Sequence, residues 1–273
     1  RIRPGVAAPE RLYPCSGSIY DIWSSGQTLF VAYSGYIVQY ALDHSIAPDT
    51  LYGLGFAHCL LVNPVQKEVL IGNENELFVY DWDTGNNRIG QMRSRLGLSL
   101  TANNGLYDPV HNCYWVGGTQ DLMRIDATTH DIQSVSELTG NKATRWVSAI
   151  IQDDFGAIWF STHTGIFRYS PEDQPYVLTH FTRKDGLSAD EFEMRMAVKT
   201  SNGHLWFGNK SGLDIINPAR FISSPAPPLL AFNDVLVMGQ PHPRRADIFQ
   251  KRALQLPYYL NTLTFKFTAL DYI

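Results

Sequence analysis

Residues 154–160 read DFGAIWF, and shortly after them residues 165–169 read GIFRY. The same phrase returns at residues 202–208 as NGHLWFG, and weaker copies lie earlier in the chain. The residues that occupy the Trp159 position in the five copies are Phe30, Leu70, Trp115, Trp159 and Trp206. Their positions are 40 to 47 residues apart, and a period in this range, made of short strands and turns, is typical of a β-propeller.

The copy around Trp159 shows the strands that we expect in each unit. An apolar run at 147–152 predicts the innermost strand, and the Asp-Asp-Phe-Gly sequence at 153–156 predicts a tight turn. Three further strands are expected at 158–161, 166–169 and 176–182. Four antiparallel strands make one blade, which must bury both of its faces against neighbouring blades. We therefore interpret the Trp of each copy as a packing residue between blades rather than as a ligand-stacking residue.

The composition excludes several classes of protein. The chain has 273 residues, 44% of them hydrophobic and 18% charged, with a net charge of −4. It has no basic stripe, so we expect no nucleic-acid partner. No run of 18 apolar residues is present, so we expect no membrane span in this chain. The three cysteines, Cys15, Cys59 and Cys113, lack the spacing of a metal site and are interpreted as buried thiols.

Motifs for catalysis or metal binding are weak. Residues 81–87 resemble a calcium loop, but the glycine and the glutamate that such a loop needs are replaced by Asn86 and Met92. The eight histidines never fall in a paired zinc spacing, and no Gly-x-Ser-x-Gly sequence is present. Glu191 and Glu193 are carboxylates that could act together only if the fold places them suitably. We therefore expect no catalytic residue, no metal and no cofactor in this chain.

Loop positions give the candidate ligand contacts. In a propeller, the loops between blades and the turns between the second and third strands of each blade share one face. In this sequence those segments are rich in Asn, Gln, His, Glu, Lys and Arg, a mixture that suits a ligand with many hydroxyl groups. The candidate ligand-binding residues are Asn75, Asn104, Gln120, Arg145, His163, Glu191 and Lys210.

The sequence changes character after the fifth copy. We expect a β-propeller region at 1–222, a proline-rich joint at 223–228 (SSPAPP) and the beginning of an Ig-like β-sandwich at 229–273. Residues 263–269 alternate strictly, so Leu263, Phe265, Phe267 and Ala269 are expected to face inward. A few strands do not make a complete sandwich, which suggests a truncated domain or strands that come from elsewhere.

Several of these segments resemble a known family. Residues 185–188 (DGLS), 154–162 and 165–169 resemble the two-component regulator propeller repeat. Residues 254–258 (LQLPY) and 261–272 (NTLTFKFTALDY) resemble the start of the Y_Y_Y domain that follows such propellers. In this order they resemble the periplasmic sensor region of a hybrid two-component histidine kinase. The resemblance is good over 147–272 and looser over 26–126.

The resemblance implies a receptor anchored in the inner membrane, with its kinase and DNA-binding domains outside this sequence. Members carry more blades than five, which implies that the chain is the last part of a larger sensor. Such sensors commonly respond to oligosaccharides and regulate polysaccharide-utilisation genes, so we expect an oligosaccharide ligand and a homodimer formed through the parent receptor. The repeat motif is structural, so no binding residue is carried over from it.

Two other functions remain open at this point. The propeller could be a scaffold that dimerises or positions other domains without a small ligand, which would appear as ligand-independent self-association. It could also be a propeller lyase or hydrolase acting on polysaccharide, which would require product formation by the isolated chain.

Overall fold

The computed structural model describes residues 18–25, 28–42, 48–74, 76–83, 88–97, 101–141, 144–172, 177–221, 229–241 and 256–270. The chain divides into two compact units, Arg1–Arg220 and Phe221–Ile273. The expected joint at 223–228 lies outside the described residues.

The described residues of the first unit form five antiparallel sheets in chain order, which confirms the propeller blades expected from the repeat. The first blade contains β1 (Ile19–Ser25), β2 (Thr28–Ala41) and β3 (Asp49–Phe56). The second contains β4 (Cys59–Asn63), β5 (Glu68–Gly72), β6 (Glu76–Asp83) and β7 (Arg88–Gly97). The third contains β8 (Ala102–Asp108), β9 (Cys113–Gly118), β10 (Leu122–Asp126) and β11 (Ile132–Ser134), and is followed by α1 (Val135–Thr139).

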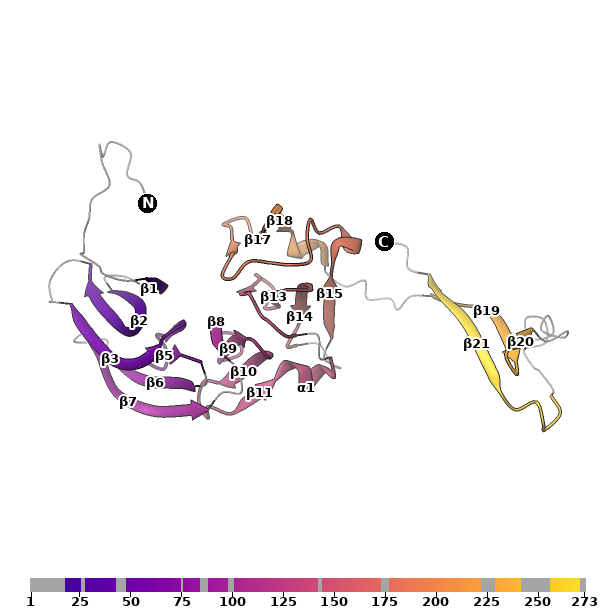
Figure 1. Ribbon diagram of the computed structural model, residues 1–273, viewed down its shortest axis with the longest axis horizontal. Helices are drawn as coiled ribbons and strands as arrows, with labels where there is room; N and C mark the ends of the chain where they lie inside the picture. The colour runs from indigo at the N-terminus through magenta and orange to yellow at the C-terminus, as the bar shows by residue number, and fades with distance from the viewer. Residues whose placement is uncertain are drawn as a thin grey trace. The chain divides into compact units, whose positions relative to one another are not determined.

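The last two blades carry the clearest copies of the repeat. The fourth contains β12 (Ala149–Gln152), β13 (Ile158–Thr162), β14 (Gly165–Tyr169) and β15 (Leu178–Phe181), and is followed by the 3₁₀ helix η1 (Arg183–Asp185). The fifth contains β16 (Ala197–Lys199), β17 (Leu205–Asn209) and β18 (Gly212–Ile216), and is followed by the 3₁₀ helix η2 (Pro218–Phe221). Figure 1 shows successive sheets of this unit side by side, from indigo β1–β3 to orange β17–β18.

In the described residues, the first and the fifth blades each form a three-stranded sheet instead of a four-stranded one. In the first blade, the rings of Tyr33 and Tyr36 stack with their centroids 4.8 Å apart. Residues three apart in a straight strand would be about 10 Å apart on opposite faces, so β2 reverses its direction near Gly35, whose φ is 85°. The described residues of the fifth blade form three strands rather than the expected four. After β18 the chain reaches Pro218, which has no N–H for a ladder, and it enters η2 instead.

The innermost strands β1, β4, β8, β12 and β16 contact one another in chain order. Each pair of successive sheets shares a cluster of buried apolar side chains. Trp115 is fully buried against Phe160 and Phe167 of the next blade. Trp159 is likewise buried against Leu205 and Phe207. These contacts confirm the inter-blade packing that we expected of the two Trp residues. Trp206 is only half-buried, because no further blade covers its face in the described part of the chain.

One carboxylate in each of two blades holds both the turn and the Trp. Asp153 Oδ1 accepts hydrogen bonds from the main-chain N–H of Phe155 and Ala157, both at 2.9 Å, and its Oδ2 accepts one from Trp159 Nε1 at 2.8 Å. Asp108 Oδ2 accepts the corresponding bond from Trp115 Nε1 at 3.2 Å. The Asp at the end of the innermost strand therefore positions the indole for packing against the next blade.

A histidine in the β8–β9 turn of the third blade links that turn to the segment after β14 of the fourth blade. His111 Nδ1 lies 2.6 Å from Asp108 Oδ2, and its Nε2 lies 2.8 Å from Glu172 Oε1. Burial disfavours the charge on this ring, but the hydrogen bonds to Asp108 and Glu172 outweigh burial and raise the pKa of His111. Burial also opposes the charge on Asp108, but hydrogen bonds from Gln152, His111 and Trp115 hold the pKa of Asp108 below its usual value.

Two of the three cysteines lie in the described part of the chain. Cys59 and Cys113 are free and buried, as expected, and burial raises the pKa of Cys113 to about 12. Cys15 lies outside the described residues. Within the described ranges, no helix has the length and apolar character needed to cross a membrane.

The second unit contains β19 (Leu229–Val237), β20 (Gln240–Pro241) and β21 (Leu263–Leu270) in one antiparallel sheet. The strand predicted at 263–269 is present, but its expected burial is wrong for Leu263, Phe265 and Phe267, which are exposed. The described residues of this unit form a single layer, so no second sheet covers that face. Nothing is described of the side chain of Ala269.

Replacing Trp159 with alanine is expected to lower the free energy of unfolding by about 3–5 kcal/mol, because it empties a fully buried site between two blades. The matched control is Trp206→Ala, which should cost less because the Trp206 ring is only partly buried on the last blade. Urea denaturation of both variants measures the difference. Equal losses would contradict the packing role of Trp159.

The His111 network predicts a pH-dependent stability. Because the folded pKa of His111 is raised, its contribution is complete below the unfolded pKa of about 6.5 and is lost as the pH rises through the folded pKa. The melting temperature of the wild type should therefore exceed that of His111→Gln most below about pH 6.5, and the gap should narrow as the pH rises through the raised pKa of His111. A gap that stays constant over this range would show that protonation of His111 contributes nothing.

Candidate ligand-binding site

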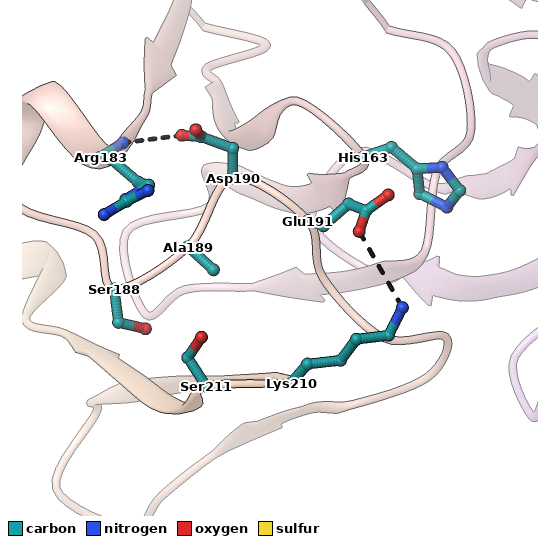
Figure 2. Close-up of a pocket in the computed structure, with 8 residues that line it drawn as sticks. All are labelled: His163, Arg183, Ser188, Ala189, Asp190, Glu191, Lys210 and Ser211. Atoms are coloured by element: carbon teal, nitrogen blue, oxygen red, sulfur yellow. Dashed lines mark hydrogen bonds and ion pairs between the residues drawn. The ribbon is translucent and has the colours of Figure 1, made fainter.

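A polar pocket of about 450 Å³ lies where loops of the fourth and fifth blades meet. It is formed by the β13–β14 turn, the segment between η1 and β16, and the β17–β18 turn. Figure 2 shows the residues that line it: His163, Arg183, Ser188, Ala189, Asp190, Glu191, Lys210 and Ser211. These are segments that we assigned to one face of the propeller from the order of the strands.

The wall made by residues 188–193 is held by main-chain bonds to both blades. Phe192 N–H donates to Thr162 O at 3.2 Å, and Glu193 N–H donates to Gly208 O at 3.0 Å. The ring of Phe192 is buried in the core between these blades. The segment that carries Asp190 and Glu191 is therefore fixed to the fourth blade on one side and to the fifth on the other.

A buried carboxylate supports the pocket beside Ser188. Asp214 accepts hydrogen bonds from the main-chain N–H and the hydroxyl of Ser188, both at 2.8 Å. Asn209 Nδ2 donates to the same Asp214 carboxylate at 2.8 Å and to Ser188 Oγ at 2.9 Å. This network holds the chain at Ser188, so that the adjacent polar residues face the pocket from a rigid base.

The short helix η1 forms the other side of the pocket. Its first turn is capped by Asp185, which accepts hydrogen bonds from Thr182 N–H at 2.8 Å and Thr182 Oγ1 at 2.9 Å. These bonds hold the pKa of Asp185 below its usual value. Asp190 Oδ1 accepts the main-chain N–H of Arg183 at 2.8 Å. The Asp-Gly-Leu-Ser sequence at 185–188 thus shapes one wall of the pocket.

The charges that line the pocket are weakly engaged with one another. Lys210 Nζ lies 4.0 Å from Glu191 Oε2, and the two side chains are 80% and 63% exposed. Solvent screens such a pair, so its contribution to stability is small. Within the described part of the chain, the guanidinium of Arg183 forms no ion pair. These side chains can turn toward a ligand without breaking a strong interaction.

An aromatic platform adjoins the pocket. The rings of Trp146 and His163 stack with their centroids 5.4 Å apart and an interplanar angle of 16°. Trp146 is 52% exposed and has a φ of 58°, a backbone conformation that is costly for a bulky residue. Because strained residues cluster at functional sites, Trp146 is a candidate contact for a ligand. The exposed part of its ring offers a flat apolar surface beside the polar pocket.

The structure brings together three of the seven predicted site residues. His163, Glu191 and Lys210 line the pocket. Arg145 is exposed and precedes Trp146, and Gln120 is exposed in the β9–β10 turn. Asn75 lies outside the described residues.

Asn104 lies in a different environment from the other candidates. It is buried in β8, where its Nδ2 donates to Val147 O at 3.1 Å and to Ser148 O at 3.2 Å. It therefore joins the third and fourth blades instead of facing solvent from a loop.

Sequence reasoning missed several residues of this site, among them Arg183, Asp190 and Trp146. Asp190 lies in a loop that we assigned to the correct face, but we did not choose it as a candidate ligand-binding residue. Arg183 directly follows the predicted outer strand, and nothing in the repeat indicates that η1 turns it toward the pocket. Trp146 lies at the start of the repeat copy, where a Trp is usually interpreted as a packing residue.

Metal binding has no support in the described residues, because no group of three or more His, Cys, Asp or Glu side chains among them is arranged to hold a metal ion.

No protein-family model matches the sequence, and no curated protein matches it. Solved structures do match. One is the extracellular domain assigned to the hybrid two component system BT3049 from B. thetaiotaomicron, with a TM-score of 0.63 and 18% identity over 92% of this chain and 35% of that chain. Another is the extracellular domain assigned to the one component system BT4673 from the same organism, with a TM-score of 0.59 and 14% identity over 81% of this chain and 31% of that chain.

The β-propeller domain of Cps50 (Swd1) from Myceliophteria thermophila also matches, with a TM-score of 0.54 and 12% identity over 72% of this chain and 63% of that chain. At these identities the likeness shows the fold, which is that of β-propeller blades. The chain spans about a third of the length of the two extracellular domains that it matches.

Removing the charge of Glu191 should leave the fold intact. Glu191→Gln is expected to change the free energy of unfolding by less than about 1 kcal/mol, because the pair with Lys210 is long and exposed. Asp214→Asn is the matched carboxylate change at a buried position, and it should cost more because it disturbs three hydrogen bonds. Thermal unfolding compares the two variants. A large loss in Glu191→Gln would mean that this wall is structural rather than available to a ligand.

Proposed function

We propose that this chain is part of the extracytoplasmic ligand-sensing region of a two-component sensor histidine kinase, and that it binds an oligosaccharide at the pocket between the fourth and fifth blades. The observation that carries the proposal is the combination at one rigid site of the exposed Trp146–His163 platform with polar side chains of both charges. The fold shared with extracellular domains of bacterial signalling systems supports the sensing role.

The chemistry of the pocket suits a sugar. Each hydroxyl group of a sugar both donates and accepts hydrogen bonds, so its site needs acceptors and donors close together. Asp190 and Glu191 accept, Arg183 and Lys210 donate, and the hydroxyl of Ser211 does both. An apolar ring face beside such polar groups is the usual composition of a small-molecule site.

The position of the pocket connects ligand binding to other blades of the propeller. A ligand that contacts Lys210 on the fifth blade and His163 on the fourth changes the balance between arrangements of the two blades only if it favours one of them. The wall between them continues to Arg195, whose N–H donates to Ser148 O at 2.7 Å. The Arg195 guanidinium donates to Asn103 O of the third blade, from Nε at 3.0 Å and from Nη2 at 2.7 Å. Movement of this wall would therefore reach three blades.

In the proposed receptor, this change passes through residues 223–228 to the Y_Y_Y-like unit at 229–273 and then to a kinase domain outside the sequence. The receptor would be periplasmic, anchored in the inner membrane and homodimeric, and it would regulate polysaccharide-utilisation genes. We assign no catalytic role to this chain.

A scaffold role is the second candidate, and one surface favours it. Val198, Leu213 and Ile215 are exposed on the outer face of the fifth blade, beside the half-buried Trp206. Strand register places Val198, Trp206 and Ile215 in one row across the sheet. If this role is the correct one, the chain associates with itself through this row whether or not an oligosaccharide is present.

A thermal-shift screen of the chain against glycan oligosaccharides, followed by titration calorimetry, tests the proposed function. A saturable ligand is expected, and Trp146→Ala should weaken its binding by about tenfold because the stacking face is lost. Gln120→Ala is the matched control, since Gln120 is exposed on the same face but, unlike Trp146, does not stack on a residue that lines the pocket. No binding by any oligosaccharide, or equal effects of the two substitutions, would contradict the proposed site.

A further inference from the structure

The exposed ring of Trp146 depends on a backbone that is held from the third blade. Its φ of 58° is costly for a bulky residue, and such a conformation persists only where the surrounding structure fixes it. The N–H of Trp146 donates to Thr119 O at 3.2 Å, and the N–H of Val147 donates to Gly118 O at 2.9 Å. Gly118 ends β9, and Thr119 follows it in the β9–β10 turn. The segment that carries the aromatic platform is therefore tied to the third blade.

A buried carboxylate in the same turn holds this segment once more. Asp121 is 4% exposed, and its Oδ1 accepts the main-chain N–H of Leu122 at 2.8 Å and the hydroxyl of Thr144. Its Oδ2 accepts the hydroxyl of Ser134, and also the hydroxyl and the main-chain N–H of Ser136 at 2.6 and 3.3 Å. These donors come from the turn, from the start of α1 and from the segment that carries the platform. Asp121 thus joins three parts of the chain.

Thr144 connects Asp121 to the platform. It is fully buried two residues before Trp146, where a hydroxyl without a partner would cost free energy. The bonds of Thr144 and Val147 fix the main chain on both sides of Trp146. The ring of His163, which lines the pocket in Figure 2, stacks on the indole from the β13–β14 turn. Loss of the Thr144 bond would let the strained backbone relax and would move the indole away from His163.

From this arrangement we infer that Asp121 is a positioning residue of the proposed site, because its bond to Thr144 holds the aromatic platform in place. The inference rests on the proposed function, since the platform belongs to that site. It gives the third blade a part in ligand binding, although the residues that line the pocket all follow β13 in the sequence. Asp121 acts on the ligand through the platform and does not itself contact it.

Fluorine NMR of the full chain labelled with 5-fluorotryptophan tests the position of the platform without a ligand. Trp146→Phe assigns the Trp146 resonance by its loss, and His163→Ala gives the position of this resonance without stacking. Thr144→Val keeps the shape of the side chain but removes the hydroxyl, so the Trp146 resonance should move toward its position in His163→Ala. Thr144→Ser keeps the hydroxyl and should leave the resonance in place. Asp121→Asn should behave as Thr144→Val does, and Thr144→Val decides the matter if Asp121→Asn does not fold.

Ser134→Ala is the matched control, because it removes a hydroxyl from the other oxygen of the same carboxylate. This variant should leave the Trp146 resonance in place. Trp115 and Trp159 are buried in the cores on either side of the fourth blade, so their resonances report whether a variant disturbs the blades in general.

Titration calorimetry tests the contribution to binding, with the oligosaccharide that binds most tightly in the thermal-shift screen as the probe. Thr144→Val should weaken binding by about tenfold, as Trp146→Ala does, because both substitutions remove the platform. The double variant should bind no more weakly than Trp146→Ala alone, because Thr144 acts only through Trp146. An effect that reached the pocket by another route would instead add to the loss.

Each outcome decides the inference. A Trp146 resonance that moves in Thr144→Val but not in Ser134→Ala, together with the loss of affinity, supports it. An unmoved resonance, an equal shift in Ser134→Ala, equal shifts of Trp115 and Trp159, an unchanged affinity or an additive double variant overturns it and leaves the proposed function standing. If no oligosaccharide in the screen binds the chain, the proposed function fails, and the role of Asp121 in binding fails with it.

Discussion

The structure of this protein depends on the burial of each blade's apolar face against the next blade. A sheet with two apolar faces cannot leave both in water, so each blade needs neighbours. Trp115 and Trp159 are the largest fully buried side chains at these contacts, and an aspartate at the end of the innermost strand fixes the indole, as Asp153 does for Trp159. In the fifth blade Thr200 stands where the aspartate would be, and Trp206 is only half-buried. Trp115 and Trp159 each have an aspartate that binds the indole, and each is completely buried. Trp206 has neither the aspartate nor complete burial.

This packing also explains why the loops are free to differ. The sheets meet through alternate residues of each strand, and the turns at the ends of the strands contribute little to the core. The segment that follows the fourth blade is an exception in one respect, because Phe192 enters the core while Asp190 and Glu191 remain at the pocket. One buried ring therefore anchors a polar wall. Rigid support beneath exposed polar groups is what a selective binding site requires, since ordering of the site on binding would otherwise cost affinity.

Strand order correctly predicted which loops lie together, whereas the surroundings of single side chains were not predictable from it; the ligand-binding role of these residues stays a prediction. His163, Glu191 and Lys210 come from three segments up to 47 residues apart, and the order of the strands was enough to assign them to one face. Asn104 belongs to the same group by sequence, but its amide joins two blades. Whether an Asn at the start of a strand faces solvent or a neighbouring sheet depends on residues of another blade, here 43 and 44 positions further along the sequence. Arg183 was missed for a similar reason, because only the turn at η1 directs it to the pocket.

The sequence by itself determined the all-β class, the number of repeat units and the residues that pack between them. These properties follow from a short period of apolar and turn-forming residues, which local geometry converts directly into strands and blades. The tertiary structure decided the pairing of loops from adjacent blades, the stacking of Trp146 on His163, and the exposure of Leu263, Phe265 and Phe267 where an alternating pattern predicts burial. Periodicity specifies which face of a strand is apolar. Only the arrangement of the sheets decides whether anything covers that face, because the covering residues lie far away in the sequence.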